Sequence, residues 1–227
     1  MKYVSVAVDG PAGSGKSTIT KMVAKSLGFN YVDTGAMYRA LTFNFLSNGL
    51  DELEEEKIKE LLSKTDFKVE YVDGVQYVYV NDVEVSDKIR TAEVSKFTSL
   101  FAKSPAVRDF LIDTQRNLAN TNNIIMDGRD IASVVLPNAD VKIFLTASVE
   151  ERARRRVLDF ERQGIENVDF EKVKEDIKAR DWQDENRDIA PLIKVESATL
   201  IDTTSLTIDE VVEKMSGNKR FAYDSYR

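Results

Sequence analysis

The sequence of 227 residues contains neither cysteine nor histidine. The absence of cysteine excludes disulfide bonds, thiol nucleophiles and thiolate metal sites. The absence of histidine excludes a Ser-His-Asp triad, histidine-ligated zinc and an imidazole general base. Any chemistry must therefore use carboxylates, lysines, arginines, hydroxyl groups and a hard metal ion. Phosphoryl transfer suits these groups, because it depends on positioning and on the neutralisation of charge.

Long apolar runs are also missing, and none approaches the roughly 20 residues that span a membrane. The chain passes almost directly from its first residue into a strand-like run, so we expect no signal peptide. Hydrophobic residues make up 42% of the chain, enough for a core, and the net charge of −7 argues against a general nucleic-acid-binding surface. We therefore expect a cytoplasmic protein, monomeric, that binds neither nucleic acid nor membranes.

A glycine-rich segment at residues 10–18 matches the phosphate-binding pattern G-x-x-x-x-G-K-[ST] in full. Its glycines allow backbone N–H groups to face a phosphate, Lys16 can reach the β- and γ-phosphates, and the Ser17 hydroxyl can bind Mg²⁺. An apolar run precedes the segment and a helical pattern follows it at 19–27, as the motif requires. The residues assigned to ATP phosphates are Gly10, Pro11, Ala12, Gly13, Ser14, Gly15, Lys16, Ser17 and Thr18.

Strand and helix patterns alternate along most of the chain. Five alternating strands predict a P-loop NTPase fold, with a parallel sheet covered by helices on both faces. Residues 64–90 differ, because short alternating runs separated by Asp73-Gly74 and Asn81-Asp82 predict a small antiparallel insertion. The core strands are expected at 3–8, 29–32, 124–126, 141–145 and 198–201. The helices are expected at 19–27, 36–47, 51–63, 91–102, 105–119, 148–163, 169–188 and 207–216.

Three of these helices begin with a sequence typical of a capping box, in which the first and fourth residues cap each other. The segments are Asp51–Glu54, Ser148–Glu151 and Thr207–Glu210. Polar clusters follow four of the predicted strands. Because ligands bind beyond the carboxyl ends of parallel strands, these clusters predict an active site at that edge. The clusters are Asp9-Gly10, Asp33-Thr34-Gly35, Asp127-Gly128-Arg129-Asp130 and Asp202-Thr203-Thr204.

Several arginines occupy informative positions. Arg39 falls in the expected first turn of the helix at 36–47, where the helix dipole disfavours a cation unless an anion is bound. Arg180, Asp184 and Arg187 are spaced i, i+4, i+7 and should share one helix face. Spacing alone leaves two interpretations of this trio, a functional cluster and an ordinary surface ion pair between Arg180 and Asp184.

A second group of arginines lies on the predicted helix at 148–163. Arg152, Arg155 and Arg156 share one side of that helix. A mobile flap that brings arginines over a γ-phosphate has this pattern, and so does a charged surface helix. The sequence leaves both interpretations open.

Four segments in order along the chain resemble the bacterial cytidylate kinases, the CMP/dCMP branch of the nucleoside monophosphate kinases. They are the loop at 10–18, Asp-Thr-Gly-Ala-Met-Tyr-Arg at 33–39, Asp-Gly-Arg-Asp at 127–130 and R-D-x-x-D-x-x-R at 180–187. The insertion at 64–90 is similar to the enlarged nucleotide-monophosphate region of these enzymes. The resemblance implies Mg²⁺-dependent phosphoryl transfer from ATP to CMP or dCMP.

The resemblance also implies roles for individual residues and regions. Residues 1–227 would form one P-loop kinase domain, with an acceptor-binding region at 36–120 and a lid at 152–187. The catalytic groups would be Lys16, Arg129 and Arg187, with Ser17 on the metal and Arg155 and Arg156 beside ATP. The CMP-binding residues would be Arg39, Ser99, Arg108, Arg129, Asp130, Arg180, Asp184 and Arg187. Whether Asp33 or Asp127 assists the metal stays open.

Three other functions remain to be separated from this one. The nearest is another small-molecule P-loop kinase that acts on UMP, AMP or a non-nucleotide hydroxyl. A P-loop GTPase would need an N-K-x-D signal, and the single Asn-Lys pair, at 218–219, is followed by Phe221 where Asp is required. The third is a nucleotide-binding module without turnover, which the arginine-rich acceptor pattern disfavours.

Overall fold

The computed structural model describes residues 3–162 and 164–217. The expected helix end at Gln163 and the Asn-Lys pair at 218–219 lie outside the described residues. The strands are β1 (Ser5–Asp9), β2 (Asn30–Asp33), β3 (Phe67–Val72), β4 (Val75–Val80), β5 (Val83–Glu84), β6 (Ile124–Gly128), β7 (Val141–Thr146) and β8 (Thr199–Asp202). The helices are α1 (Lys16–Leu27), α2 (Thr34–Ser47), α3 (Glu55–Ser63), α4 (Ala92–Phe101), α5 (Pro105–Thr121), α6 (Val149–Arg162), α7 (Phe170–Glu185) and α8 (Ile208–Ser216), and a short π-helix η1 (Ile131–Val135) follows β6.

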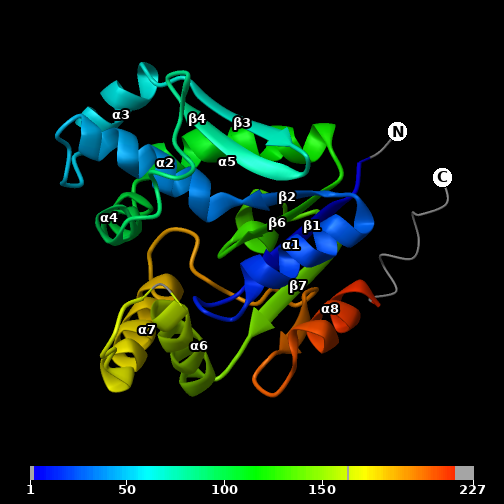
Figure 1. Cartoon of the computed structure of the whole chain (residues 1–227). Coiled ribbons are helices and arrows are strands. Elements are labelled where there is room, and N and C mark those ends of the chain that lie inside the picture. Colours follow the sequence, from blue (N-terminus) through cyan, green and yellow to red (C-terminus); the bar gives the residue numbers. More distant parts are fainter. Residues whose placement is uncertain (1–2, 163, 218–227) are drawn as a thin grey trace.

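Five parallel strands form the central sheet in the order β2-β6-β1-β7-β8, which confirms the predicted fold class (Figure 1). Successive side chains of a strand point to opposite faces. Along β1, Val6 and Val8 therefore pack with α1 and α8, whereas Ala7 packs into the core beneath α2 and α5. Both faces of the sheet are buried, as continuous apolar strands predict.

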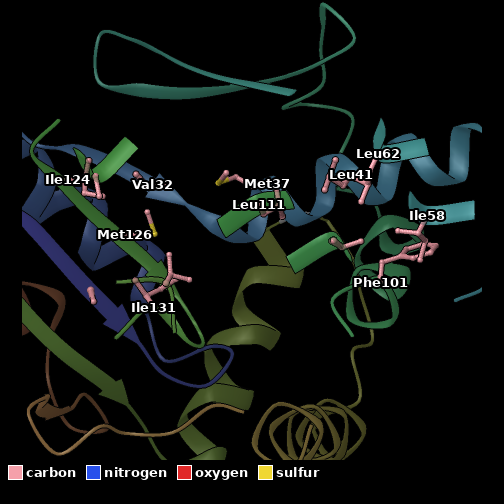
Figure 2. Close-up of a cluster of buried hydrophobic side chains, with 14 of the residues drawn as sticks. Val32, Met37, Leu41, Ile58, Leu62, Phe101, Leu111, Ile124, Met126 and Ile131 are labelled. Carbon is pink, nitrogen blue, oxygen red and sulfur yellow. The ribbon is translucent and has the colours of Figure 1, made fainter. Parts of the chain in front are cut away.

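The larger core lies between the sheet and the helices α2, α3 and α5 (Figure 2). Met37 and Leu41, one helical turn apart on α2, are fully buried there and lie near Leu111 of α5. Phe45 continues the same face of α2, and its ring meets Phe101 of α4 edge to face, with centroids 5.0 Å apart. This packing holds α2 and α4 in fixed positions above the sheet edge.

The residues between α3 and α4 form the antiparallel meander that the sequence predicts, in the order β3-β4-β5. In Figure 1 this second sheet lies over α2 and α5. Val78 and Val80 of β4 are buried against Ala36 and Ala40 of α2. The insertion therefore shares a hydrophobic core with the helix that follows β2.

The parallel register brings the carboxyl ends of the strands to one edge. Asp9 of β1 is aligned with Gly128 of β6, and Asp33 of β2 is aligned with Asp127. None of the helices in the part of the chain that the structure describes has the length and apolarity needed to cross a bilayer.

Of the capping boxes predicted from the sequence, the one at α8 is confirmed and the one at α3 is not. Thr207 and Glu210 form the predicted reciprocal capping box of α8. The prediction for Asp51 is wrong, because α3 begins only at Glu55 and has Glu54 as its N-cap residue, without a side-chain cap. The Glu54 carboxylate instead accepts a hydrogen bond from Lys57 at 2.7 Å.

The expected capping box of α6 is half formed. The Ser148 hydroxyl accepts a hydrogen bond from the backbone N–H of Glu151 at 3.2 Å, as predicted. The Glu151 carboxylate does not return to the backbone, because it pairs with Arg154 and Arg155. Charged neighbours one turn further along the helix therefore compete with the cap.

Gly10 is the glycine of the loop with the least space around it. Its φ is +148°, and an added Cβ would lie 1.9 Å from the carbonyl oxygen of Leu145 on β7. We expect Gly10→Ala to lower the free energy of unfolding by at least ~3 kcal/mol, measured by urea denaturation, because buried backbone cannot yield. Gly28→Ala is the control: its φ is +67°, no atom lies within 4 Å of the added Cβ, and a loss of only about 1–2 kcal/mol is expected. Equal losses in the two variants would show that the backbone of β7 does not restrict residue 10.

Candidate active site

The carboxyl edge of the parallel sheet borders a cavity of about 1130 Å³. The phosphate loop, α2, α4, the end of β6, the helices α6 and α7, and the turn after β8 contribute to its walls. Gly10 and Pro11, the first two residues of the loop, do not line it. The predicted site residues that line the cavity are Ala12, Gly13, Ser14, Gly15, Lys16, Ser17, Thr18, Arg39, Ser99, Arg108, Arg129, Asp130, Arg155, Arg156, Arg180, Asp184 and Arg187.

The phosphate loop presents an open helix N-terminus to this cavity. Gly15 is the N-cap residue of α1, with φ +87°, and no side chain caps the first turn. The Lys16 ammonium folds back over the loop and donates to the carbonyl oxygens of Gly10 at 2.6 Å and Pro11 at 2.7 Å. Burial, reinforced by the charge of Arg129, lowers the pKa of Lys16 well below its ordinary value. Free N–H groups and a desolvated ammonium would both be stabilised by a bound anion.

Next to the loop, three oxygen-bearing side chains meet. The Ser17 hydroxyl donates to Asp127 Oδ2 at 2.8 Å, and the Tyr31 hydroxyl donates to Asp127 Oδ1 at 3.0 Å. Burial, together with the nearby Asp33 carboxylate, raises the pKa of Asp127 to about 6. Oxygen ligands of this kind suit Mg²⁺. The sequence left open whether Asp33 or Asp127 assists the metal ion, and the hydrogen bond from Ser17 favours Asp127.

Asp33, the other candidate for the metal, is bound to α2 rather than to the phosphate loop. Its Oδ1 accepts the backbone N–H of Ala36 at 2.8 Å and thereby caps α2, and its Oδ2 accepts from Arg39 at 3.2 Å. Because α2 begins at Thr34, Arg39 lies in the second turn of the helix rather than in the first turn predicted from the sequence. The guanidinium nevertheless reaches back to the helix start, where the Asp33 carboxylate offsets the helix dipole.

Two guanidinium groups on this edge have unused donors. Arg39 Nε and Arg187 Nη2 are buried without a hydrogen-bond partner among the described residues. Arg187 Nη2 lies 3.6 Å from Asp130 Oδ1, which is an ion pair but too long for a hydrogen bond. Burial lowers the pKa of Arg187. Since buried N–H groups are almost always paired, these orphan donors indicate an anion site beside the phosphate loop.

The predicted helix face of Arg180, Asp184 and Arg187 needs correction. Helix α7 ends at Glu185, so Arg187 lies in the turn beyond it. Asp184 pairs with Arg129, whose Nε lies 2.8 Å from Asp184 Oδ2, so the surface ion pair with Arg180 is not formed. Desolvation and repulsion from Arg129 lower the pKa of Arg180. The arginines of this edge are therefore crowded together rather than paired along one helix.

Arg108 of α5 and Asp130, which also line the cavity, form a buried ion pair. Ser99 of α4 lines the same cavity. The pair presents a guanidinium donor beside a carboxylate acceptor, which is the arrangement needed to recognise a ring edge that carries an acceptor and a donor side by side.

The arginines of α6 take three different positions. Arg155 donates to the Thr203 hydroxyl at 3.0 Å and to the Thr203 carbonyl oxygen at 2.7 Å, which ties α6 to the end of β8. The Arg156 guanidinium lies 4.7 Å from the centre of the Phe160 ring. Arg152 is buried and does not line the cavity. Only Arg155 and Arg156 of this trio are therefore placed to reach a ligand.

Gln76 of β4 supports the site, although the sequence pattern did not single it out. Its amide accepts the backbone N–H of Asp33 at 2.7 Å and donates to the Asp33 carbonyl oxygen at 3.2 Å. The insertion thus holds the residue that caps α2 and pairs with Arg39. The sequence did contain a signal for this role, because Gln76 is the single amide side chain in the otherwise apolar and aromatic strand 75–80. The apolar residues that border the cavity, Leu158 and Ile208 among them, were also missed and carried no signal.

Asp9, which belongs to one of the predicted polar clusters, holds the backbone at the start of η1. Its carboxylate is 1% exposed and accepts the backbone N–H groups of Ile131 at 2.8 Å and Ala132 at 2.7 Å. It thereby caps the start of η1, directly after Arg129 and Asp130. Burial raises the pKa of Asp9 to about 6. The end of β1 is thus joined to the loop that carries two predicted acceptor residues.

A phosphate loop that borders an arginine-lined cavity at the carboxyl edge of a parallel sheet is typical of the class of P-loop kinases. Within this class, the chain belongs to the cytidylate kinase family, whose model matches residues 6–219. It is 49% identical over 216 residues to a cytidylate kinase from Leuconostoc mesenteroides, covering 95% of this chain and 96% of the relative. It is 47% identical to a cytidylate kinase from Caldicellulosiruptor bescii, covering 95% of each chain.

Among solved structures, an uncharacterized protein from Eubacterium ventriosum superposes with a TM-score of 0.50 at 12% identity. The match covers 94% of this chain and 96% of that one. At this identity the likeness concerns the fold alone.

The buried carboxylate of Asp9 predicts a pH-dependent stability. Its pKa is about 6 in the folded state against 3.8 ordinarily, so between these values the folded state holds a proton that the unfolded state has released. The unfolding free energy of the native protein, minus that of Asp9→Asn, should therefore fall by about 1–3 kcal/mol from pH 4 to pH 7. Urea denaturation at a series of pH values measures this difference.

Asp202→Asn is the control for this prediction. The pKa of exposed Asp202 is lowered by hydrogen bonds from Thr204, so the corresponding difference should rise with pH and not fall. A difference between native protein and Asp9→Asn that stays constant across the range would show that Asp9 is already ionised in the folded state at pH 4.

Proposed function

We propose that this protein transfers the γ-phosphoryl group of ATP to CMP or dCMP, which gives ADP and CDP or dCDP. The observation that carries the proposal is that Arg39 and Arg187, each with a buried donor that lacks a hydrogen-bond partner, line the same cavity as the phosphate loop. Membership of the cytidylate kinase family supports the choice of nucleotide.

On the donor side, the loop N–H groups and Lys16 would hold the ATP phosphates. Ser17 and Asp127 would hold Mg²⁺, directly or through water. The described residues contain no cluster of three or more side chains of the kinds that commonly bind metals, so phosphate and water oxygens would complete the ligand set. Mg²⁺ would supply charge neutralisation at the β- and γ-phosphates. Arg155 and Arg156 would approach the same phosphates from α6.

On the acceptor side, Arg39, Arg129 and Arg187 would bind the CMP phosphate, and Arg180 and Asp184 would meet the ribose. The attacking phosphate oxygen is already anionic, so the reaction needs no general base. The obstacle is repulsion between two polyanions. Arginines that already crowd this edge offset that repulsion most strongly where charge accumulates in the transition state.

The base would be recognised by Arg108, Asp130 and Ser99. Cytosine carries an amino donor beside the N3 acceptor, whereas uracil carries an oxygen acceptor beside an N–H donor. The buried Asp130 carboxylate can accept from the amine, and the Arg108 guanidinium can donate to N3. With UMP, the uracil O4 acceptor would face the Asp130 carboxylate, which is also an acceptor, and the uracil N3–H donor would face the Arg108 guanidinium.

The regional organisation belongs to the same proposal. Residues 36–120 would form the acceptor-binding region, with the insertion at 64–90 as its outer part, and residues 152–187 would form the lid. The cytoplasmic location and the monomeric state stay predictions.

A coupled assay of ADP release tests the proposal. ATP and Mg²⁺ are supplied with CMP, dCMP, UMP, AMP or no acceptor. We expect rapid ADP release with CMP or dCMP and little without an acceptor. Equal rates with and without an acceptor would indicate a hydrolase, no turnover would indicate a binding module, and a preference for UMP or AMP would indicate a different kinase.

Lys16→Ala should remove most of the turnover and leave the fold intact. The ammonium neutralises charge on the transferring group, so we expect kcat to fall by about 10²–10³-fold. Circular dichroism and thermal unfolding check the fold. Lys25→Ala, an exposed lysine on the same helix, is the control and should keep the native rate. A folded Lys16→Ala variant with near-native kcat would contradict the phosphate-loop assignment.

Asp130→Asn should narrow the preference for CMP over UMP. The native site should favour CMP by about 10⁴-fold or more in kcat/KM, because mispaired buried polar groups are costly. The asparagine amide can donate to the uracil O4, so the ratio of kcat/KM values should fall. Loss of activity on both nucleotides with an unchanged ratio would show that Asp130 does not contact the base.

A further inference from the structure

Outside the cavity, Arg152 of α6 and Asp181 of α7 form a buried ion pair. Arg152 Nη1 lies 2.7 Å from Asp181 Oδ2, and the two side chains are only 4% and 13% exposed. Neither residue lines the cavity. Burying two charges carries a desolvation penalty that their attraction repays only when the remaining polar atoms are also satisfied.

This pair does not satisfy that condition. Asp181 Oδ1 is buried without a hydrogen-bond partner among the described residues. The two helices are already joined by an apolar cluster that includes Ala153 of α6 and Val173 and Ile177 of α7. Stability therefore does not account for the ion pair, and a positional role does.

The remaining contacts of Arg152 indicate what it positions. Its Nε donates to the carbonyl oxygen of Ala147, at the end of β7, at 2.9 Å. Its Nη1 donates to the carbonyl oxygen of Ala12, within the phosphate loop, at 3.2 Å. At Gly13 the fit is also close, because an added Cβ would lie 3.2 Å from the Arg152 Cβ. One guanidinium thus contacts the phosphate loop, the central sheet and α7.

Helix α7 carries residues that the proposed function assigns to the acceptor. Asp181 follows Arg180 in the sequence, and Asp184 lies one turn further along and pairs with Arg129. Two ion pairs therefore hold α7: Asp184 pairs with Arg129 at the edge of the sheet, and Asp181 pairs with Arg152 of α6. The pair of Asp184 lies inside the cavity, and the pair of Asp181 lies behind the phosphate loop. Loss of the second pair would leave α7 held by the Asp184 pair, by its apolar contacts with α6 and by the ion pair between Lys174 and Glu150, but no longer tied to the phosphate loop through Arg152.

We propose that Arg152 is a positioning residue, which holds α7 against the phosphate loop so that Arg180 and Asp184 of this helix, and Arg187 just beyond its end, are placed to bind the acceptor nucleotide. It contacts neither nucleotide. This role rests on the proposed function, since it concerns the geometry between the donor and acceptor sites. It predicts that breaking the ion pair impairs use of CMP while the donor site still binds its nucleotide.

The sharpest test replaces both charges with apolar groups, in the double variant Arg152→Met/Asp181→Leu. Replacing a buried ion pair by apolar residues of similar volume is often neutral or stabilising, so the fold should persist. We expect the midpoint of thermal unfolding to stay within a few degrees, the Kd for ADP to stay within about threefold, and kcat/KM for CMP to fall by about 10-fold or more. Arg154 is an exposed arginine of the same helix, and Arg154→Met is the control. It should match the native protein in unfolding midpoint, in Kd for ADP and in kcat/KM for CMP.

A second measurement reads the position of α7 directly. The chain has one tryptophan, Trp182, which follows Asp181 on α7 and is 67% exposed. Its time-resolved fluorescence anisotropy should decay further in the double variant, because a less firmly held helix moves more on the nanosecond timescale. The same change is expected in Asp181→Asn, which keeps the volume and removes the charge.

Two results would overturn the proposal. One is a kcat/KM for CMP within about threefold of the native value in the folded double variant. The other is a loss of kcat/KM accompanied by equal losses in ADP affinity and thermal stability, which would assign Arg152 a structural role only. If the native protein does not phosphorylate CMP, the proposed function fails instead, and an unchanged Trp182 anisotropy would then show separately that the ion pair does not hold α7.

Discussion

The rest of this structure depends on buried or half-buried carboxylates around the edge of the parallel sheet, which accept hydrogen bonds or ion pairs from arginines, hydroxyl groups or backbone N–H groups. Each is attached to a rigid element, and each directs a partner toward the cavity or secures the loop behind it. Without them the crowded cations would repel one another, and a polyanionic ligand would have to organise them. The carboxylates are Asp9, Asp33, Asp127, Asp130, Asp181 and Asp184.

The hydrophobic core makes this arrangement possible. Apolar strands buried on both faces align the carboxyl ends in one register, so Asp33 and Asp127 become neighbours although they lie far apart in the sequence. The insertion extends the same principle, because its sheet packs over α2 (Figure 1). That packing brings the Gln76 amide to the backbone of Asp33. A sheet that looks peripheral therefore supports the acceptor side of the site.

Most of the architecture could be predicted from the sequence, because its signals are local. The phosphate loop, the five alternating strands, the meander and the capping box at Thr207 each depend on residues within a few positions of one another. The failures have a common cause. In both failed capping boxes the glutamate that should return to the backbone, Glu54 or Glu151, instead pairs with a lysine or arginine within one helical turn, and at Asp51 the helix itself begins later than predicted. A pattern shows that a side chain can make a bond, not which partner obtains it.

The sequence by itself determined the fold class, the phosphate loop and the set of groups available for chemistry, since these follow from residue type and short spacing. Only the tertiary structure decided the partners: Asp127 rather than Asp33 meets Ser17, and Asp184 binds Arg129 rather than Arg180. Likewise, one helix buries Arg152 and presents Arg155 to the cavity. The physical reason is that long charged side chains reach several turns or strands. Their partners are selected by burial and by competition among elements that meet only in the folded chain.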